Sequence, residues 1–320
     1  MDIQFGVFLD IDSVDRSDLD LTELNATLPS WRFFHKTQLV QVAERIQQAH
    51  IVVSNKILLH KQAIEQARDL ALICVAATGT NNVDLKAANQ RGITVCNVRD
   101  YATGSVVQHV FTLILNLSTQ FLFYHDAMLA GQWQKSEQFC LLDFPIQELA
   151  GKTLGIIGYG VLGHAVAQVA RAFGMHVIIA DHKGVLPRPG RVAFADVLKQ
   201  ADVISLHCPL NEATKNLIGR EELIAMKSTA LLINAARGGI VDEAAMVDAL
   251  KQRYIAGAGF DVLTEEPPLH GNVLLESGLP NLIVTPHIAW ASRESRQRLI
   301  DEIVKNVEAF KAGKPRNTVN

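Results

Sequence analysis

The chain has 320 residues, of which 48% are hydrophobic and 20% are charged, and its formal net charge at pH 7 is −3. This length is enough for about two domains that each bury a core, and the composition excludes a chain that is disordered throughout. The near-neutral charge excludes the strongly basic surface that is typical of proteins that bind nucleic acid or anionic membranes.

Neither the N-terminal segment nor the longest apolar segment resembles a targeting signal. The N-terminal residues are acidic rather than basic, and polar side chains interrupt the apolar residues 106–123, which predicts a buried helix and not a membrane span. The four cysteines lie far apart without a Cys-x-x-Cys pair, which argues against a zinc site or a disulfide framework. We therefore predict a soluble, cytoplasmic protein without a metal.

In the first hundred residues, short β-branched segments alternate with helical ones, as in a parallel sheet that is covered by helices. The predicted strands are residues 3–9, 31–34, 50–53, 70–75 and 93–96, and helices are predicted at 38–48 and 61–66. We expect a small α/β domain here.

From residue 100 onward the pattern becomes more regular. A long helix is predicted at 105–124, a polar stretch follows at 131–148, and the last helix covers 293–312. Six further strands are predicted at 153–157, 176–180, 203–207, 230–234, 258–262 and 282–285. Six strands with helical segments between most of them fit one doubly wound domain.

A glycine motif follows the first strand of this second series. It reads Gly-Tyr-Gly-Val-Leu-Gly over residues 158–163, and a plausible helix (164–173) comes next, which is the order of a dinucleotide-binding turn. Gly158 would permit the tight turn, Gly160 the approach of a pyrophosphate, and Gly163 close packing of the helix on the strand. The free N–H groups of the helix start would face the phosphates.

Asp181 ends the next predicted strand, 18 residues after Gly163. A carboxylate there can accept hydrogen bonds from the ribose hydroxyls of adenosine and would repel a 2′-phosphate, which favours NAD over NADP. The alternative is an ordinary loop or helix-capping aspartate. His182 and Lys183 follow, and they weaken the preference for NAD slightly.

Charged or imidazole side chains follow nearly every later strand. In open α/β sheets ligands bind outside the carboxyl ends of the strands, so these positions predict a reactive edge. Arg237 could bind a carboxylate through two N–H groups, His287 could donate a proton, and Glu266 could orient and charge that imidazole. Each residue alone is commonly structural, but the three beside a dinucleotide site are suited to carbonyl reduction.

These motifs resemble those of the D-isomer-specific 2-hydroxyacid dehydrogenase family. The matching segments are residues 149–160, 207–209, 234–239, 261–262, 266–267 and 285–287, and residues 77–84 in the first domain. The resemblance covers nearly the whole chain. Within the family it is greatest to the glycerate dehydrogenases, which are also called hydroxypyruvate reductases.

The resemblance implies an α/β fold with two domains. Residues 100–289 would form a doubly wound Rossmann domain that binds NAD. Residues 1–99 and 290–320 would form a smaller, flavodoxin-like α/β substrate domain, to which the C-terminal helix returns. The family's arrangement also implies a homodimer around the helix near residues 105–124.

The resemblance further assigns roles to single residues. Arg237 would bind the carboxylate and carbonyl of the substrate, His287 would donate the proton, and Glu266 would keep His287 charged. Backbone amides near Thr78 and Gly79 would hold the substrate carboxylate. The residues that would bind NAD or line the path to its nicotinamide are Gly158, Gly160, Val161, Leu162, Gly163, Asp181, His207, Cys208, Pro209, Thr214, Ala235, Arg237 and Asp261.

The predicted function is reduction of hydroxypyruvate to D-glycerate, and of glyoxylate to glycolate, with NADH. The partner would be a small 2-keto or 2-hydroxy acid, and neither nucleic acid nor membrane. D-3-phosphoglycerate and D-lactate dehydrogenases are alternatives, although only Lys56 offers a further cation for a phosphorylated substrate. An NAD-sensing corepressor is the alternative that is not an enzyme, and the lack of a long tail disfavours it.

Overall fold

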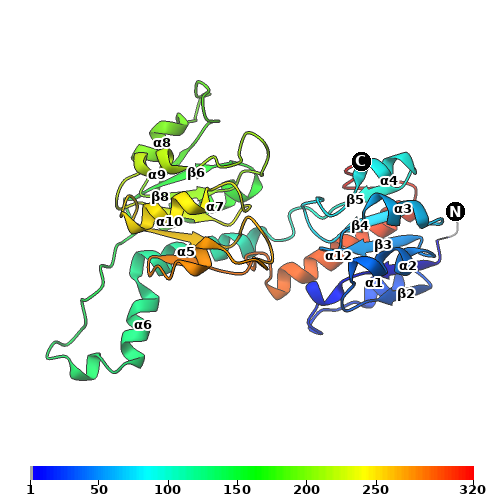
Figure 1. Cartoon of the computed structure of the whole chain (residues 1–320), viewed down its shortest axis with the longest axis horizontal. Coiled ribbons are helices and arrows are strands. Elements are labelled where there is room, and N and C mark those ends of the chain that lie inside the picture. The colour runs from blue at the N-terminus through cyan, green and yellow to red at the C-terminus, as the bar shows by residue number, and fades with distance from the viewer. Residues whose placement is uncertain (1–2) are drawn as a thin grey trace. The chain divides into compact units, whose positions relative to one another are not determined.

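The computed structural model describes residues 3–320, and these fold as two units that each surround a parallel sheet (Figure 1). Unit 1 is formed by the chain before Thr103 together with Trp290–Asn320, and unit 2 is Thr103–Ala289. The expected boundary after residue 99 lies within four residues of this division. Residues 1 and 2 of the expected first domain lie outside the described residues.

The sheet of unit 1 has the strand order β2-β1-β3-β4-β5, and all its strands are parallel. Its strands are β1 (Phe5–Phe8), β2 (Ser30–Phe33), β3 (Ile51–Ser54), β4 (Leu72–Val75) and β5 (Thr94–Cys96). Its helices are η1 (Ile11–Ser13), α1 (Thr22–Ala26), η2 (Leu39–Gln41), α2 (Val42–Ile46), α3 (Lys61–Gln66), α4 (Leu85–Gln90) and α12 (Arg293–Lys311). The five predicted strands of this region are confirmed.

Helices cover both faces of this sheet, which explains why β3 and β4 are apolar at successive positions. Alternate residues contribute to the two faces. Val52 packs with side chains of α2, α3 and α4, whereas Ile51 and Val53 pack with side chains of α1 and α12. The C-terminal helix is therefore part of the core of unit 1.

The sheet of unit 2 has the strand order β11-β10-β9-β8-β6-β7 and is also parallel throughout. Its strands are β6 (Thr153–Ile157), β7 (His176–Ile179), β8 (Val203–Leu206), β9 (Leu231–Asn234), β10 (Gly257–Phe260) and β11 (Leu282–Val284). Its helices are α5 (Thr103–Thr119), α6 (Phe121–Leu129), η3 (Trp133–Lys135), α7 (Val161–Ala172), α8 (Phe194–Gln200), α9 (Arg220–Ala225), α10 (Glu243–Lys251) and α11 (Val273–Glu276). The chain reverses direction across the sheet between β6 and β8, and ligands bind at such a switch point.

The prediction of a single helix over residues 105–124 is wrong. Gln120 has a left-handed backbone with φ 54°, so α5 ends at Thr119 and α6 leaves at a bend of 63°. The side-chain amide of Gln120 donates to the carbonyl of Leu117 and so takes over an acceptor of the last turn. No single helix of residues 3–320 is long and apolar enough to cross a membrane. Helices α5 and α6 reach that length and apolar composition only when they are taken together, across the bend.

Candidate active site

The turn between β6 and α7 is shaped by two glycines that touch backbone. Gly158 has φ 95°, and a Cβ there would lie 2.4 Å from the backbone nitrogen of Cys208. A Cβ on Gly163 would lie 2.2 Å from the carbonyl oxygen of Gly158. Both positions therefore exclude any side chain, as the motif requires for a tight turn and for close packing of the helix.

Gly160 is open, in contrast to these two glycines. A Cβ there would have no heavy atom of the described residues within 4 Å, and Gly160 has no side chain to cap α7. The first turn of α7, which begins with Val161 and Leu162, thus has no side-chain cap, and the positive end of the helix dipole lies beside the open position of Gly160. This arrangement fits the pyrophosphate of a dinucleotide.

Asp181 lies just beyond β7, as expected, but its carboxylate is covered. The side chain is only 1% exposed. One carboxylate oxygen accepts hydrogen bonds from the backbone N–H of Arg188 (2.8 Å) and from its Nε (2.9 Å). The other accepts hydrogen bonds from Nη2 of Arg188 (2.7 Å) and from the backbone N–H of His182 (2.9 Å). The Arg188 guanidinium holds the pKa of Asp181 well below its usual range, so this carboxyl is ionised. The sequence analysis missed Arg188.

The residues predicted to lie beside the nicotinamide follow β8 and β9. The imidazole Nε2 of His207 lies 2.9 Å from the Ser205 hydroxyl, and its buried Nδ1 has no hydrogen-bond partner among the described residues. Burial lowers the pKa of His207 to about 4, so the ring is neutral at pH 7. The hydroxyl of Thr214 donates to the carbonyl of Pro209 (2.6 Å) and closes the loop after Cys208. Ala235 follows β9 directly.

Arg237 lies in the loop after β9 and is exposed. The Asn234 side chain fixes this loop, because its oxygen accepts from the backbone N–H of Ala236 and its nitrogen donates to the carbonyl of Arg237. Nη1 of Arg237 donates to the carbonyl of Ala236 (2.7 Å), which orients the guanidinium. The rest of the guanidinium is able to bind a carboxylate.

Glu266 and His287 form a hydrogen-bonded pair. Nδ1 of His287 lies 2.6 Å from Oε2 of Glu266, and both side chains are about one-third exposed. The other carboxylate oxygen of Glu266 accepts the backbone N–H of Leu263 (2.8 Å), which fixes the carboxylate from the second side. With a carboxylate at Nδ1, Nε2 is the ring nitrogen that would exchange a proton with a ligand.

The buried carboxylate of Asp261 holds the loop that carries His287. It accepts the backbone N–H groups of Ile288 (2.9 Å) and Ala289 (2.8 Å) and the hydroxyl of Thr285 (2.6 Å). The backbone N–H of His287, whose φ is 54°, donates to the carbonyl of Asp261. Asp261 was predicted to line the cofactor path, which stays a prediction; in the structure its carboxylate binds the loop that carries His287. The sequence analysis assigned no role to Thr285 or to His109, whose Nε2 lies 3.4 Å from this carboxylate.

Arg237, Glu266 and His287 follow β9, β10 and β11, which are neighbours in the sheet. Because the carboxyl ends of parallel strands lie at one edge, the fold brings the three to the same end of unit 2 as the glycine turn. Thr78 and Gly79 belong instead to unit 1, in the loop after β4, where the Thr78 hydroxyl donates to the carbonyl of Val98. Their assignment to the substrate stays a prediction. Among residues 3–320, no group of three or more His, Cys, Asp or Glu side chains is placed to hold a metal ion.

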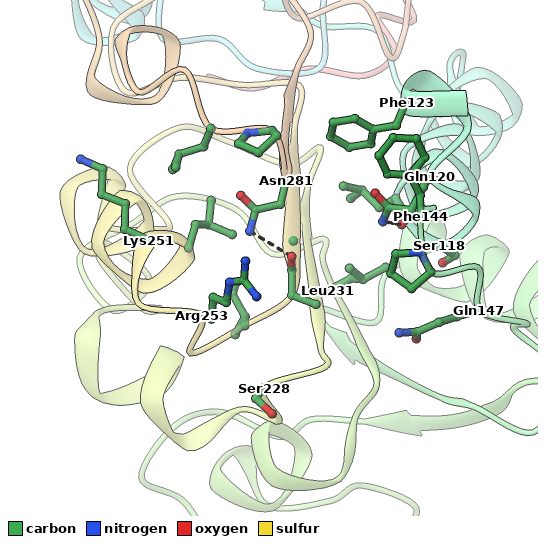
Figure 2. Close-up of a pocket in the computed structure, with 18 residues that line it drawn as sticks. Ser118, Gln120, Phe123, Phe144, Gln147, Ser228, Leu231, Lys251, Arg253 and Asn281 are labelled. Atoms are coloured by element: carbon green, nitrogen blue, oxygen red, sulfur yellow. Dashed lines mark hydrogen bonds between the residues drawn. The ribbon is translucent and has the colours of Figure 1, made fainter. Parts of the chain in front are cut away.

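A cavity of about 690 Å³ lies at the opposite edge of the same sheet (Figure 2). It is lined by Leu231 at the start of β9, Gly257 at the start of β10 and Asn281 just before β11. The bend at Gln120 and the ring of Phe144 form another side. These are the amino ends of the strands, so this cavity is separate from the reactive edge.

A dinucleotide turn, an exposed guanidinium and a carboxylate–imidazole pair at one sheet edge define a dinucleotide-dependent oxidoreductase that acts on a small acid. Known proteins of similar sequence belong to the same class. Residues 111–289 match the model of the NAD binding domain of D-isomer specific 2-hydroxyacid dehydrogenases. The chain is 49% identical over 308 residues to the glycerate dehydrogenase of Methylorubrum extorquens, which covers 94% of this chain and 97% of that protein.

Two further relatives extend over almost the whole chain. The hydroxypyruvate reductase of Blautia hydrogenotrophica is 37% identical over 321 residues, which is 98% of this chain and 99% of that one. The structure of D-lactate dehydrogenase with NAD+ from Lactobacillus jensenii has a TM-score of 0.81 and 28% identity, with 99% of both chains covered. The chain belongs to the D-isomer specific 2-hydroxyacid dehydrogenase family, and the predicted α/β fold, enzyme class and NAD cofactor are confirmed.

The two kinds of glycine in the turn predict two different defects. Gly163→Ala should lower the free energy of unfolding, by about 1–3 kcal/mol, because its Cβ would overlap the Gly158 carbonyl. Gly160→Ala should leave stability unchanged but weaken NADH binding, because the new methyl group would lie where the pyrophosphate approaches. Urea unfolding and calorimetric titration with NADH measure the two effects. Equal stability losses in both variants would contradict this account.

Proposed function

We propose that the enzyme reduces hydroxypyruvate to D-glycerate with NADH, and glyoxylate to glycolate more slowly. The observation that carries the reaction type is the 2.6 Å contact between Glu266 and His287, at the sheet edge that also presents Arg237. The choice of substrate is supported by the glycerate dehydrogenase and the hydroxypyruvate reductase to which the chain is 49% and 37% identical.

In this proposal the protein supplies orientation and a proton. The Arg237 guanidinium binds the substrate carboxylate and withdraws electrons from the adjacent carbonyl. When bound, the reduced nicotinamide supplies the hydride to the carbonyl carbon. The carbonyl oxygen takes its proton from Nε2 of His287, while the negative charge of Glu266 at Nδ1 stabilises the charged imidazole before transfer.

The substrate assignment predicts an order of activities. With NADH, kcat/KM should be highest for hydroxypyruvate, lower for glyoxylate, and lower still for pyruvate and 3-phosphohydroxypyruvate. Initial rates from the absorbance of NADH at saturating cofactor measure all four acids. A highest value for 3-phosphohydroxypyruvate or pyruvate would assign the enzyme to those substrates instead. No turnover with any of the four would favour a protein that only binds NAD.

The proton transfer predicts a loss of rate in two variants. Glu266→Gln should lower kcat for hydroxypyruvate, because a neutral amide no longer stabilises the charged imidazole that donates the proton. His287→Ala should lower kcat by about 10²–10⁴-fold, because it removes the donor itself. The measurement is kcat and KM for hydroxypyruvate at saturating NADH.

Glu265→Gln is the matched control for this experiment. Glu265 contacts His270 at 2.9 Å, but this carboxylate–imidazole pair is exposed and is not one of the proposed catalytic residues. Its kcat should equal that of the wild type, and NADH binding should be unchanged in all three variants. A wild-type kcat in Glu266→Gln would remove Glu266 from its proposed role.

We also propose that the enzyme is a homodimer. In Figure 1, α6 and the segment that follows it project away from the rest of unit 2. Both carry large apolar side chains that are more than one-third exposed, namely Phe121, Leu122, Met128, Leu129, Trp133, Phe139, Leu142 and Ile146. A surface of this kind is typical of a protein–protein interface.

The dimer is tested by a charge on this surface. Leu129 is 75% exposed, and Leu129→Asp should convert a particle of two 35.1 kDa chains into a single chain, because an aspartate cannot be buried unpaired at an apolar interface. Val40→Asp, at an 86% exposed position of unit 1, is the control and should stay dimeric. Sedimentation equilibrium measures both masses. A wild-type enzyme that sediments as one chain would contradict the proposal.

A cytoplasmic location is part of the same proposal. It is supported by the state of the cysteines, since Cys74, Cys96, Cys140 and Cys208 all carry free thiols. Free thiols are usual where the compartment is reducing.

A further inference from the structure

The hydrogen bonds of Asp181 leave little room for a ribose. The usual carboxylate at this position accepts hydrogen bonds from the adenosine hydroxyls and rejects a 2′-phosphate through its charge. Here each carboxylate oxygen already accepts two hydrogen bonds, and the side chain is 1% exposed. A carboxylate has about four acceptor positions, so those of Asp181 are filled. A ribose at the end of β7 would meet Arg188 before it met Asp181.

Arg188 itself remains accessible. Its side chain is 63% exposed although it forms the ion pair. The guanidinium is a planar fork, and only the edge with Nε and Nη2 faces Asp181. The N–H groups of the opposite edge are therefore able to donate to a second anion, and guanidinium matches phosphate geometry well.

The loop around Arg188 is basic. Residues 182–191 contain His182, Lys183, Arg188 and Arg191 and no Asp or Glu. Lys183 is paired with Glu222 (2.7 Å) from α9, and the guanidinium of Arg191 lies 5.0 Å from the ring of Tyr159 in the glycine turn. With Asp181 and Glu222 each balanced by one cation, Arg191 adds positive charge beside Tyr159 of the glycine turn.

We propose that Arg188 determines cofactor selectivity: it neutralises Asp181 and offers its outer N–H groups to the 2′-phosphate of NADPH, so that the enzyme uses NADPH as well as NADH. For NADH, the same groups donate to the ribose hydroxyl oxygens. This inference extends the proposed function to a second form of the cofactor, and it rests on that function for turnover but not for binding.

The test is direct binding of each cofactor without any acid substrate. Calorimetric titrations of the wild-type enzyme with NADPH and with NADH should give Kd values within about tenfold of each other. Arg188→Ala should weaken NADPH binding by about 10- to 100-fold, the usual effect of losing a charged hydrogen bond, and should weaken NADH binding much less. Asp181→Asn should shift the ratio the other way, because it removes the acid and leaves Arg188 in place.

Arg171→Ala is the matched control, because it removes an exposed arginine from the far end of α7. It should leave both Kd values unchanged. A wild-type enzyme that binds NADPH more than 100-fold more weakly than NADH would overturn the proposal. So would an Arg188→Ala variant that loses both cofactors equally, since Arg188 would then only support the loop. Because no acid is present, these results stand apart from the substrate assignment.

Discussion

The cofactor end of unit 2 depends on the contact of backbone with backbone at the turn between β6 and α7. Gly158 lies against the peptide at Cys208, and Gly163 lies against the carbonyl of Gly158, so strand β8, the turn and the helix are fixed to one another without any side chain between them. The first turn of α7 therefore has a defined position at the switch point of the sheet. The cofactor site depends on this contact, and the loops after β8 to β11 are placed relative to it by the hydrogen bonds of the sheet.

A second layer of polar contacts holds the residues that are proposed to react. Asn234 fixes the loop of Arg237, Asp261 fixes the loop of His287, and the N–H of Leu263 fixes Glu266. Each of these contacts involves backbone groups that would otherwise lack a partner near the end of a strand. The reactive side chains are left exposed or half-exposed, while the groups that position them are buried. Rigidity and access to a ligand are thus provided by different residues.

The sequence was enough to predict all eleven strands, because most of them are runs of apolar residues buried on both faces. The three proposed catalytic residues stand in the loops after β9, β10 and β11, and their roles stay a prediction. The sequence could not predict the end of α5, since the apolar pattern continues through Gln120 and only the backbone changes. The ion pair between Arg188 and Asp181 could not be predicted either. Arg188 reaches that carboxylate because a loop with prolines and glycines folds back, and the residues between them show no periodicity. The sequence assigned no role to Thr285 and His109, because they meet Asp261 only in the folded chain.

Unit 1 combines residues before Thr103 with residues after Ala289, so during synthesis it is completed later than unit 2. Unit 2 is continuous and is available to fold once Ala289 has left the ribosome. Unit 1 lacks one layer of its core until Leu299, Ile303 and Val307 of α12 arrive. Its last strand waits longer, since the side chain of Asn320 bonds to the backbone of Ile93 and Val95. Strands β1 to β5 therefore belong to the unit that is finished later, and they stay exposed to other chains until α12 has been made.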